Sequence, residues 1–213
     1  MCALGETGAY LARQGCNVTA FDITPEMVSE GRKRFGSISK LQICEGDVTN
    51  FRFDISPVDF CFSQDFGHIH TIEDVKKALK CINSHLRQGG CVVIETGLRL
   101  PGIESSHQPP KTFFPQKQIY PGTKVWKTGE TRYDANTGRT FISQTFYAED
   151  ESGTIESFNH EFYLQGYYRE EWLAAFNECG FDIAGEYNNR EFESWQSGGS
   201  GYRIFEAVKQ TLM

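Results

Sequence analysis

The sequence lacks any long apolar run, since no stretch of its 213 residues approaches the length of about 18 apolar residues that a membrane-spanning helix needs. It also lacks a CxxC pair, although it contains seven cysteines. The odd number and wide spacing of these cysteines favour free thiols, so we expect a cytoplasmic protein without a disulfide framework. Residues 1–4 show neither the basic start nor the apolar stretch of a signal peptide.

Basic residues are in short supply, with 21 Lys and Arg against 28 Asp and Glu, a formal net charge of −7. This balance disfavours a nucleic-acid partner, because phosphate binding usually requires a basic face. His68 and His70 stand apart from other ligand types, so we expect no metal site. The 17 phenylalanines argue against a disordered chain, and the length fits one domain, or one domain with a substantial insertion.

Helical and strand-like segments alternate along the first half of the chain. Thr24 and Pro25 are typical of a helix start, and Gly15 and Gly36 of helix ends. The alternation predicts a mostly parallel sheet covered by helices on both faces. Helices are expected over 5–14, 25–35, 72–86 and 169–179, and strands over 17–21, 41–45, 58–63, 91–95, 181–187 and 202–208.

The character of the sequence changes after Thr96. Residues 97–121 hold five of the seven prolines and lack periodicity, which predicts an irregular crossing or lid. Strand-like segments follow at 125–132, 139–147 and 155–164, separated by turn clusters, and they predict an antiparallel meander. We therefore expect a core formed by 1–98 and 168–213, and an inserted lid and antiparallel β substrate subdomain over 99–167.

The first residues have the layout of a nucleotide site. Gly5 opens a helix after Cys2-Ala-Leu, and Asp22 ends the strand that follows. A glycine lets the backbone approach a ligand, and a strand-ending carboxylate can accept hydrogen bonds from both hydroxyls of a ribose. The same layout suits a nicotinamide-dependent oxidoreductase, and it also occurs as plain structure.

Later motifs separate these alternatives. They are Asp22-Ile-Thr-Pro-Glu-Met27, Glu45-Gly-Asp47-Val48, the strand 58–63 with its loop, and Leu86-Arg-Gln-Gly-Gly90 before the strand 91–95. In this order the sequence resembles the class I S-adenosylmethionine-dependent methyltransferases, continuously over 2–96 and again over 168–208. The resemblance implies an α/β fold with a doubly wound, mostly parallel, Rossmann-like sheet that carries the inserted antiparallel β-subdomain.

The resemblance also implies a set of cofactor-binding residues for S-adenosyl-L-methionine. The glycine-rich loop would pass its methionine part, Asp22 would bind the ribose, and Asp47 the adenine amino group. Met27 has an alternative role in the helix core, and Asp47 as the start of a turn. The implied residues are Cys2, Ala3, Gly5, Asp22, Ile23, Met27, Asp47, Val48, Ser63, Gln64 and Phe66.

The chain departs from the family pattern in two ways. Ala3 stands where the family usually has glycine, which adds a methyl group beside the cofactor. The sequence also begins at the glycine-rich loop, without the family's first strand, so we expect a fragment of a longer protein or a truncated relative. These departures leave open a degenerate, non-catalytic methyltransferase-like protein.

The expected reaction is in-line methyl transfer to a small molecule at nitrogen or oxygen. Gln64-Asp-Phe-Gly67 stands where an Asn-Pro-Pro-Tyr sequence would indicate methylation of an adenine or glutamine amino group, and no Pro-Cys pair offers a thiolate for a pyrimidine. His68 or His70 is a candidate base, with a hydrogen-bonded loop histidine as the alternative. Asp65 and Phe66 can face a cation through charge and ring quadrupole.

Overall fold

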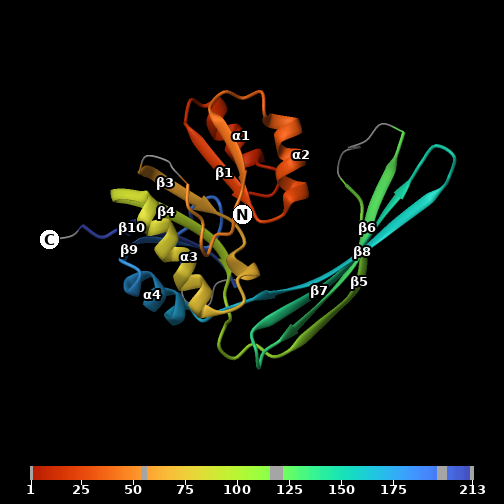
Figure 1. The fold of residues 1–213 in the computed structure, drawn as a ribbon. Helices are drawn as coiled ribbons and strands as arrows, with labels where there is room; N and C mark the ends of the chain where they lie inside the picture. The colour runs from red at the N-terminus through yellow and green to blue at the C-terminus, as the bar shows by residue number, and fades with distance from the viewer. Residues whose placement is uncertain (1, 54–56, 116–121, 196–200, 212–213) are drawn as a thin grey trace. The chain divides into compact units, whose positions relative to one another are not determined.

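The computed structural model describes residues 2–53, 57–115, 122–195 and 201–211. The chain forms two compact units. The first combines Met1–Leu98 with Arg169–Met213, and the second is Arg99–Tyr168. The first unit is therefore built from both ends of the sequence, and the second is inserted between them (Figure 1).

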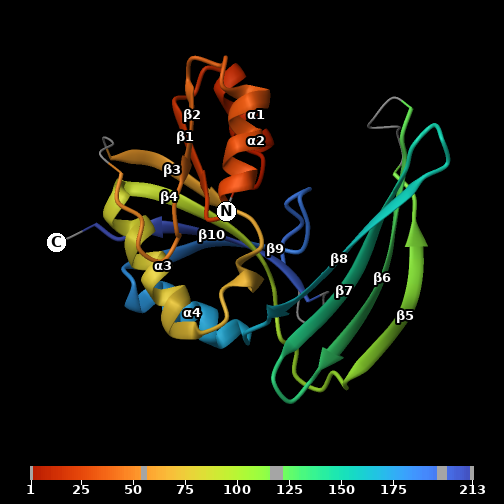
Figure 2. The same cartoon turned by 45° about the vertical axis from the view of Figure 1, so that its right-hand side comes forward.

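The first unit begins with two helix–strand pairs, and Figure 2 shows both helices on one side of the two strands. Gly8 permits this packing, because a Cβ there would lie 3.3 Å from Cβ of Ala20. The strands are parallel, from Val18 opposite Leu41 to Asp22 opposite Glu45. The elements are α1 (Glu6–Arg13), β1 (Val18–Asp22), α2 (Pro25–Phe35) and β2 (Leu41–Glu45).

A second sheet of the first unit has the strand order β3-β4-β10-β9. Strands β3 and β4 are parallel, whereas β10 runs antiparallel to both β4 and β9. The elements are β3 (Val58–Ser63), the short 3₁₀ helix η1 (Phe66–His68), α3 (Ile72–His85), β4 (Leu86–Gly97), α4 (Arg169–Glu178), β9 (Phe181–Tyr187) and β10 (Tyr202–Lys209).

An aromatic cluster joins the two sequence-distant parts of the first unit. The Trp172 side chain is fully buried, and its ring centroid lies 5.7 Å from those of both Phe66 and Phe205. Asn83 of α3 also donates hydrogen bonds to the carbonyls of Cys179 and Gly180 at 3.0 and 3.1 Å. Residues after 168 therefore complete the core that residues before 98 begin.

The expected single, mostly parallel sheet needs correction. In the described residues of the first unit, the strands form two separate sheets, β1-β2 and β3-β4-β10-β9. The pairs β1–β2 and β3–β4 are parallel, while the two pairs that involve β10 are antiparallel. The prediction that helices and parallel strands alternate in the first half of the chain is confirmed from α1 to β4.

The second unit is a four-stranded antiparallel sheet in the order β5-β6-β7-β8. Three of its strands confirm the predicted meander. The fourth, β5, lies inside the proline-rich segment that the sequence predicts to be irregular. Pro109 and Pro110 fit there because β5 is an edge strand and its register shifts between Gln108 and Lys111. The strands are β5 (Ser106–Phe113), β6 (Lys124–Asp134), β7 (Arg139–Glu149) and β8 (Ile155–Gln165).

The first and last residues of the second unit contact each other. The backbone N–H of Arg99 donates to the carbonyl of Tyr167 at 2.9 Å. The Arg99 guanidinium also lies over the Tyr168 ring, 4.6 Å from its centroid. The chain thus enters and leaves this unit through neighbouring residues.

Candidate active site

The carboxyl ends of β1, β3 and β4 carry polar residues, of which the sequence singles out those of β1 and β3. Asp22 ends β1, Ser63 ends β3, and Glu95 lies near the end of β4. In α/β folds, ligands bind at the carboxyl ends of parallel strands. This edge is therefore the candidate active site of the first unit.

The loop before α1 has a left-handed backbone at two positions. The φ angle is +48° at Ala3 and +84° at Gly5, the residue that precedes the helix. Helix α2 approaches this loop closely, since a Cβ on Gly31 would lie 2.5 Å from the carbonyl oxygen of Leu4. The loop conformation is the one that a glycine adopts readily, although Ala3 occupies it.

Asp22 is buried, with 9% of its surface exposed, and both of its carboxylate oxygens accept backbone hydrogen bonds. Oδ2 accepts from the N–H of Ala3 at 2.8 Å, and Oδ1 from the N–H of Thr24 at 3.1 Å. A carboxylate has about four acceptor positions, so Asp22 keeps capacity for a ligand hydroxyl while it anchors the loop. Thr24 is the N-cap residue of α2 and Pro25 follows it, as the sequence predicts, although the Thr24 side chain makes no capping hydrogen bond.

Two large apolar side chains are exposed beside Asp22. Ile23 is 60% exposed and Met27 is 42% exposed. Met27 is therefore not part of the helix core, which α2 provides through Val28 and Gly31. Exposed apolar side chains next to a buried carboxylate are suited to cover the flat face of a ligand ring.

Asp47 opens a turn after β2. Its Oδ1 accepts hydrogen bonds from the backbone N–H and the hydroxyl of Thr49, both at 2.8 Å. Val48 beside it is buried. Asp47 therefore starts a turn, which is one of the two roles that the sequence allows for it. Only Oδ1 of its carboxylate takes part in the hydrogen bonds of this turn.

The loop after β3 brings several predicted residues to the same edge. Ser63 is 4% exposed, and its hydroxyl has no hydrogen-bond partner among the described residues. Gln64 donates through Nε2 to Oε2 of Glu95 at 3.2 Å. Asp65 has φ of +58°, a left-handed conformation that is uncommon for residues other than glycine. Backbone strain of this kind concentrates at functional sites.

His68 lies beside Asp65, with 3.5 Å between Nε2 and Oδ2. The hydrogen bond to the Asp65 carboxylate raises the pKa of His68, and the charges of Asp65 and Asp22 add to the effect against the opposing influence of burial. His70 is exposed and lies two residues further along.

Phe66 does not have the expected place at the edge. Its side chain is fully buried and packs against Trp172 of α4. The ring therefore belongs to the core and is not available to face a cation at the surface. Cys2 stays in the loop before α1, where burial is the main factor that raises the pKa of its thiol to about 11.

The sequence gives little sign of one further cluster. Arg190 donates to Glu95 through Nε at 3.0 Å and Nη2 at 2.8 Å, and the Glu95 side chain is only 8% exposed. Glu95 has a weak signal, because it is a charged residue that closes an apolar strand. Arg190 has none, since it lies 95 positions away in the segment between β9 and β10.

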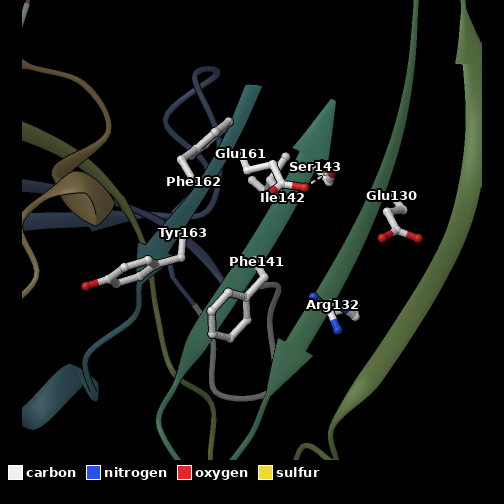
Figure 3. Close-up of a pocket in the computed structure, with 8 residues that line it drawn as sticks. All are labelled: Glu130, Arg132, Phe141, Ile142, Ser143, Glu161, Phe162 and Tyr163. Carbon is white, nitrogen blue, oxygen red and sulfur yellow. Dashed lines mark hydrogen bonds between the residues drawn. The ribbon is translucent and has the colours of Figure 1, made fainter. Parts of the chain in front are cut away.

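The second unit has a shallow hollow of about 260 Å³ (Figure 3). In it the Ser143 hydroxyl donates to Oε1 of Glu161 at 3.1 Å. The Tyr163 ring faces Arg139, whose guanidinium lies 4.7 Å from the ring centroid. The hollow is lined by Glu130, Arg132, Phe141, Ile142, Ser143, Glu161, Phe162 and Tyr163.

Among the residues that the structure describes, no helix is long and apolar enough to span a membrane. Over the same residues, no group of three or more His, Cys, Asp or Glu side chains is arranged to hold a metal ion.

The structure resembles those of solved methyltransferases along almost its whole length. An S-adenosylmethionine-dependent methyltransferase from Clostridium acetobutylicum aligns with a TM-score of 0.81 at 16% identity, over 99% of this chain and 82% of that chain. The sugar N-methyltransferase KedS8 from Streptoalloteichus aligns with a TM-score of 0.76 at 16% identity, over 99% of this chain and 78% of that chain. The chain therefore shares the fold of these two methyltransferases.

Sequence comparison agrees with this fold. Residues 1–90 match the family described as a methyltransferase domain. A demethylmenaquinone methyltransferase of Staphylococcus epidermidis is 32% identical over 103 residues, which are 48% of this chain and 37% of the relative's length. The likeness to methyltransferases therefore rests on the fold of almost the whole chain and on the sequence of its first 90 residues.

Proposed function

We propose that this chain binds S-adenosyl-L-methionine at the carboxyl edge of β1 and transfers its methyl group to a small molecule. The observation that carries the proposal is the buried carboxylate of Asp22, placed between the left-handed loop at Ala3 and the exposed side chains of Ile23 and Met27. A polar anchor with an apolar cover beside it fits a nucleoside.

The individual roles follow from position. The loop Cys2–Gly5 would hold the methionine part of the cofactor, and Asp22 the ribose hydroxyls. Ile23 and Met27 would cover the adenine, with Val48 at its rim and Asp47 toward its amino group. Ser63 and Gln64 would border the sulfonium side. When bound, S-adenosylmethionine supplies an electrophilic methyl group, so the protein's task is to align an acceptor with it.

The acceptor is proposed to be a nitrogen or oxygen of a small molecule. Asp65 and His68 would act at this step, since neutral His68 can take a proton from the acceptor at Nδ1 while the Asp65 carboxylate, on the Nε2 side, orients the ring. An amine fits the acidic surroundings of Asp22 and Asp65 better than an anionic acceptor does. The neighbour KedS8, a sugar N-methyltransferase, provides a precedent for an amine.

The unit Arg99–Tyr168 is proposed to bind the acceptor. Its hollow combines charged side chains, such as Glu130 and Arg132, with the aromatic rings of Phe141 and Tyr163. A site of this composition suits a polar ligand with an apolar ring or edge.

Calorimetric titration with S-adenosylhomocysteine tests the cofactor site. Asp22→Asn should weaken binding about 10- to 100-fold, because a charged hydrogen bond to a ligand hydroxyl is worth about 1.5–3 kcal/mol. Asp59→Asn is a matched control, since Asp59 has a side chain that is 82% exposed and lies at the other end of β3. Unchanged affinity of Asp22→Asn, or tighter binding of NADH than of S-adenosylhomocysteine, would contradict the proposal.

If the cofactor product binds, methyl transfer is measured next with labelled S-adenosylmethionine and a panel of amines, phenols and carboxylic acids. Transfer to at least one acceptor, lost in His68→Ala, supports the catalytic assignment. Binding without transfer to any class of acceptor would favour the non-catalytic alternative.

A further inference from the structure

One face of the β5-β6-β7-β8 sheet carries a row of aromatic side chains interrupted by one lysine. Phe113, Lys127, Phe146 and Phe158 are successive register partners across the four strands. The Lys127 ammonium lies 5.7 Å from the centroid of Phe113 and 5.8 Å from that of Phe146. We call this side of the sheet the aromatic face.

The row continues along β8. The ring centroids of Phe158 and His160 are 6.1 Å apart, and those of His160 and Phe162 are 4.9 Å apart. Residues two apart on a strand point to the same side, so His160 and Phe162 belong to the aromatic face. The face therefore combines a row across the sheet with a column along its edge strand.

The aromatic face has no cover within its own unit. Phe158 is 63% exposed, Phe113 49% and Phe146 39%. Between Arg99 and Tyr168, the described residues form strands and turns only, without a helix or second sheet to pack on this face. Antiparallel sheets of soluble proteins usually have one covered face, and large exposed apolar patches mark interaction sites.

The opposite face differs in the charged side chains that stand among its rings, such as Glu130, Arg132 and Glu161. Trp126 stacks on Tyr147 with centroids 5.1 Å apart, and Lys124 lies over Trp126 at 5.1 Å. Tyr163 is covered by Arg139 at 4.7 Å. This second face is polar and contains the hollow of Figure 3, so the aromatic face is the one that calls for a partner.

We propose that the aromatic face is a dimer interface, covered by the same face of a second copy of this chain. With a two-fold axis parallel to the strands, two stacked copies face each other in reversed strand order. Phe113 then lies opposite Phe158 of the partner subunit, and Lys127 opposite Phe146 of the partner subunit. Each lysine meets a phenyl ring instead of a like charge, which is a favourable cation–π arrangement.

The size of the face suits a stable dimer. Strands β6, β7 and β8 each have 11 residues. At about 3.3 Å per residue and about 4.8 Å between strands, four strands present about 700 Å² per copy. Standard protein interfaces bury about 800 Å² per partner, so the face alone approaches the area that a specific dimer requires. The proposal does not depend on the methyltransferase activity.

Analytical ultracentrifugation of the full chain tests the interface. The wild-type chain should sediment at twice the 24.2 kDa of one chain at low micromolar concentration. Phe146→Ser should raise the dimer dissociation constant at least about 100-fold, since a central aromatic contact is typical of an interface hot spot. Phe141→Ser is the matched control: it lies on the same strand but on the polar face, and is 38% exposed against 39% for Phe146.

A charge reversal gives a second, independent measurement. Lys127→Glu should also dissociate the dimer, because a carboxylate would oppose the negative face of a phenyl ring. Lys124→Glu, on the same strand and the polar face, should leave the dimer intact, and Lys127→Arg should preserve it. Circular dichroism and S-adenosylhomocysteine titration of each variant show that the monomer remains folded.

Two outcomes would overturn the proposal. One is a wild-type chain that remains monomeric up to about 100 µM, a concentration at which even a weak specific interface is populated. The other is a dimer that both Phe146→Ser and Lys127→Glu leave unchanged. Failure here with normal S-adenosylhomocysteine binding would leave the proposed function untouched, and loss of cofactor binding with an intact dimer would have the opposite meaning.

Discussion

The backbone N–H of Ala3 donates a hydrogen bond of 2.8 Å to Oδ2 of Asp22, so the end of β1 fixes the loop that precedes α1. Thr24 donates to the other oxygen of the same carboxylate. Asp22 therefore joins three segments before any ligand arrives. Its substitution should affect the free protein as well as the proposed cofactor site.

Asp22→Ala should lower the free energy of unfolding by about 1–3 kcal/mol without ligand, because two N–H groups of a partly buried loop lose their acceptor. Urea denaturation followed by circular dichroism measures this change. Asp59→Ala, which removes an exposed carboxylate, should change the unfolding free energy by less than about 1 kcal/mol. Equal effects of the two substitutions would show that Asp22 does not anchor the loop.

Ala3→Gly should stabilise the protein by up to about 1 kcal/mol. Alanine at φ of +48° has an unfavourable left-handed backbone, whereas glycine adopts this conformation freely and loses only part of the gain to its greater unfolded-state entropy. Thermal unfolding of the two proteins side by side measures the difference. A loss of stability in Ala3→Gly would mean that the methyl group of Ala3 makes a contact that outweighs its backbone strain.

Gly31→Ala should destabilise the protein by about 1–3 kcal/mol and weaken S-adenosylhomocysteine binding. The added Cβ would lie 2.5 Å from the carbonyl oxygen of Leu4, so α2 or the loop must shift. The control is Ser29→Ala, an exposed position of the same helix, which should be neutral or slightly stabilising. Wild-type stability in Gly31→Ala would rule out the close contact.

Asp65→Asn should move the acidic limb of the methyl-transfer rate to lower pH. The Asp65 carboxylate raises the pKa of His68, and a base must be neutral to accept a proton, so activity increases as pH rises through this raised pKa. Without the carboxylate, His68 becomes neutral at a lower pH. The pH profile of kcat/KM measures the shift, and an unchanged profile in Asp65→Asn would exclude His68 as the titrating base.

Removal of Arg190 should lower the free energy of unfolding, because the buried carboxylate of Glu95 loses its cationic partner. Although burial opposes it, hydrogen bonding to Arg190 holds the pKa of Glu95 below its usual range, so the pair stabilises the protein at neutral pH and less as pH falls through that pKa. The unfolding free energy of Arg190→Met should therefore fall further below wild type at pH 7 than at pH 4. A gap that does not vary with pH would refute this account.

Local patterns in the sequence predict most of the elements because local physics determines them. Thr71, for example, accepts a hydrogen bond from the N–H of Asp74 at 3.1 Å, as its place before a helix indicates. The pairing of strands is less accessible. The edge position of β5 depends on its pairing with β6, which begins more than ten residues later. No pattern within residues 106–113 indicates this pairing.

Some residues of the candidate site can likewise be predicted from the local sequence, whereas others depend on distant residues. Asp22 and its exposed apolar neighbours can be predicted, because they follow one strand directly. Phe66 cannot be assigned correctly from its own surroundings, since Trp172, more than 100 positions later, buries it. The Glu95–Arg190 pair is equally non-local, and its partners meet only when β9 and β10 are in place.

The hydrogen bond between Arg99 and Tyr167 has a consequence for how this protein can change over evolution. It keeps the two ends of the inserted unit hydrogen-bonded to each other. The α/β core therefore has to connect only two neighbouring chain ends, whatever the length of the insertion. Closing a longer loop costs only about 0.6 kcal/mol for each doubling. Strands can therefore be lengthened, shortened or replaced beyond this hydrogen bond at little cost in loop closure to the α/β core.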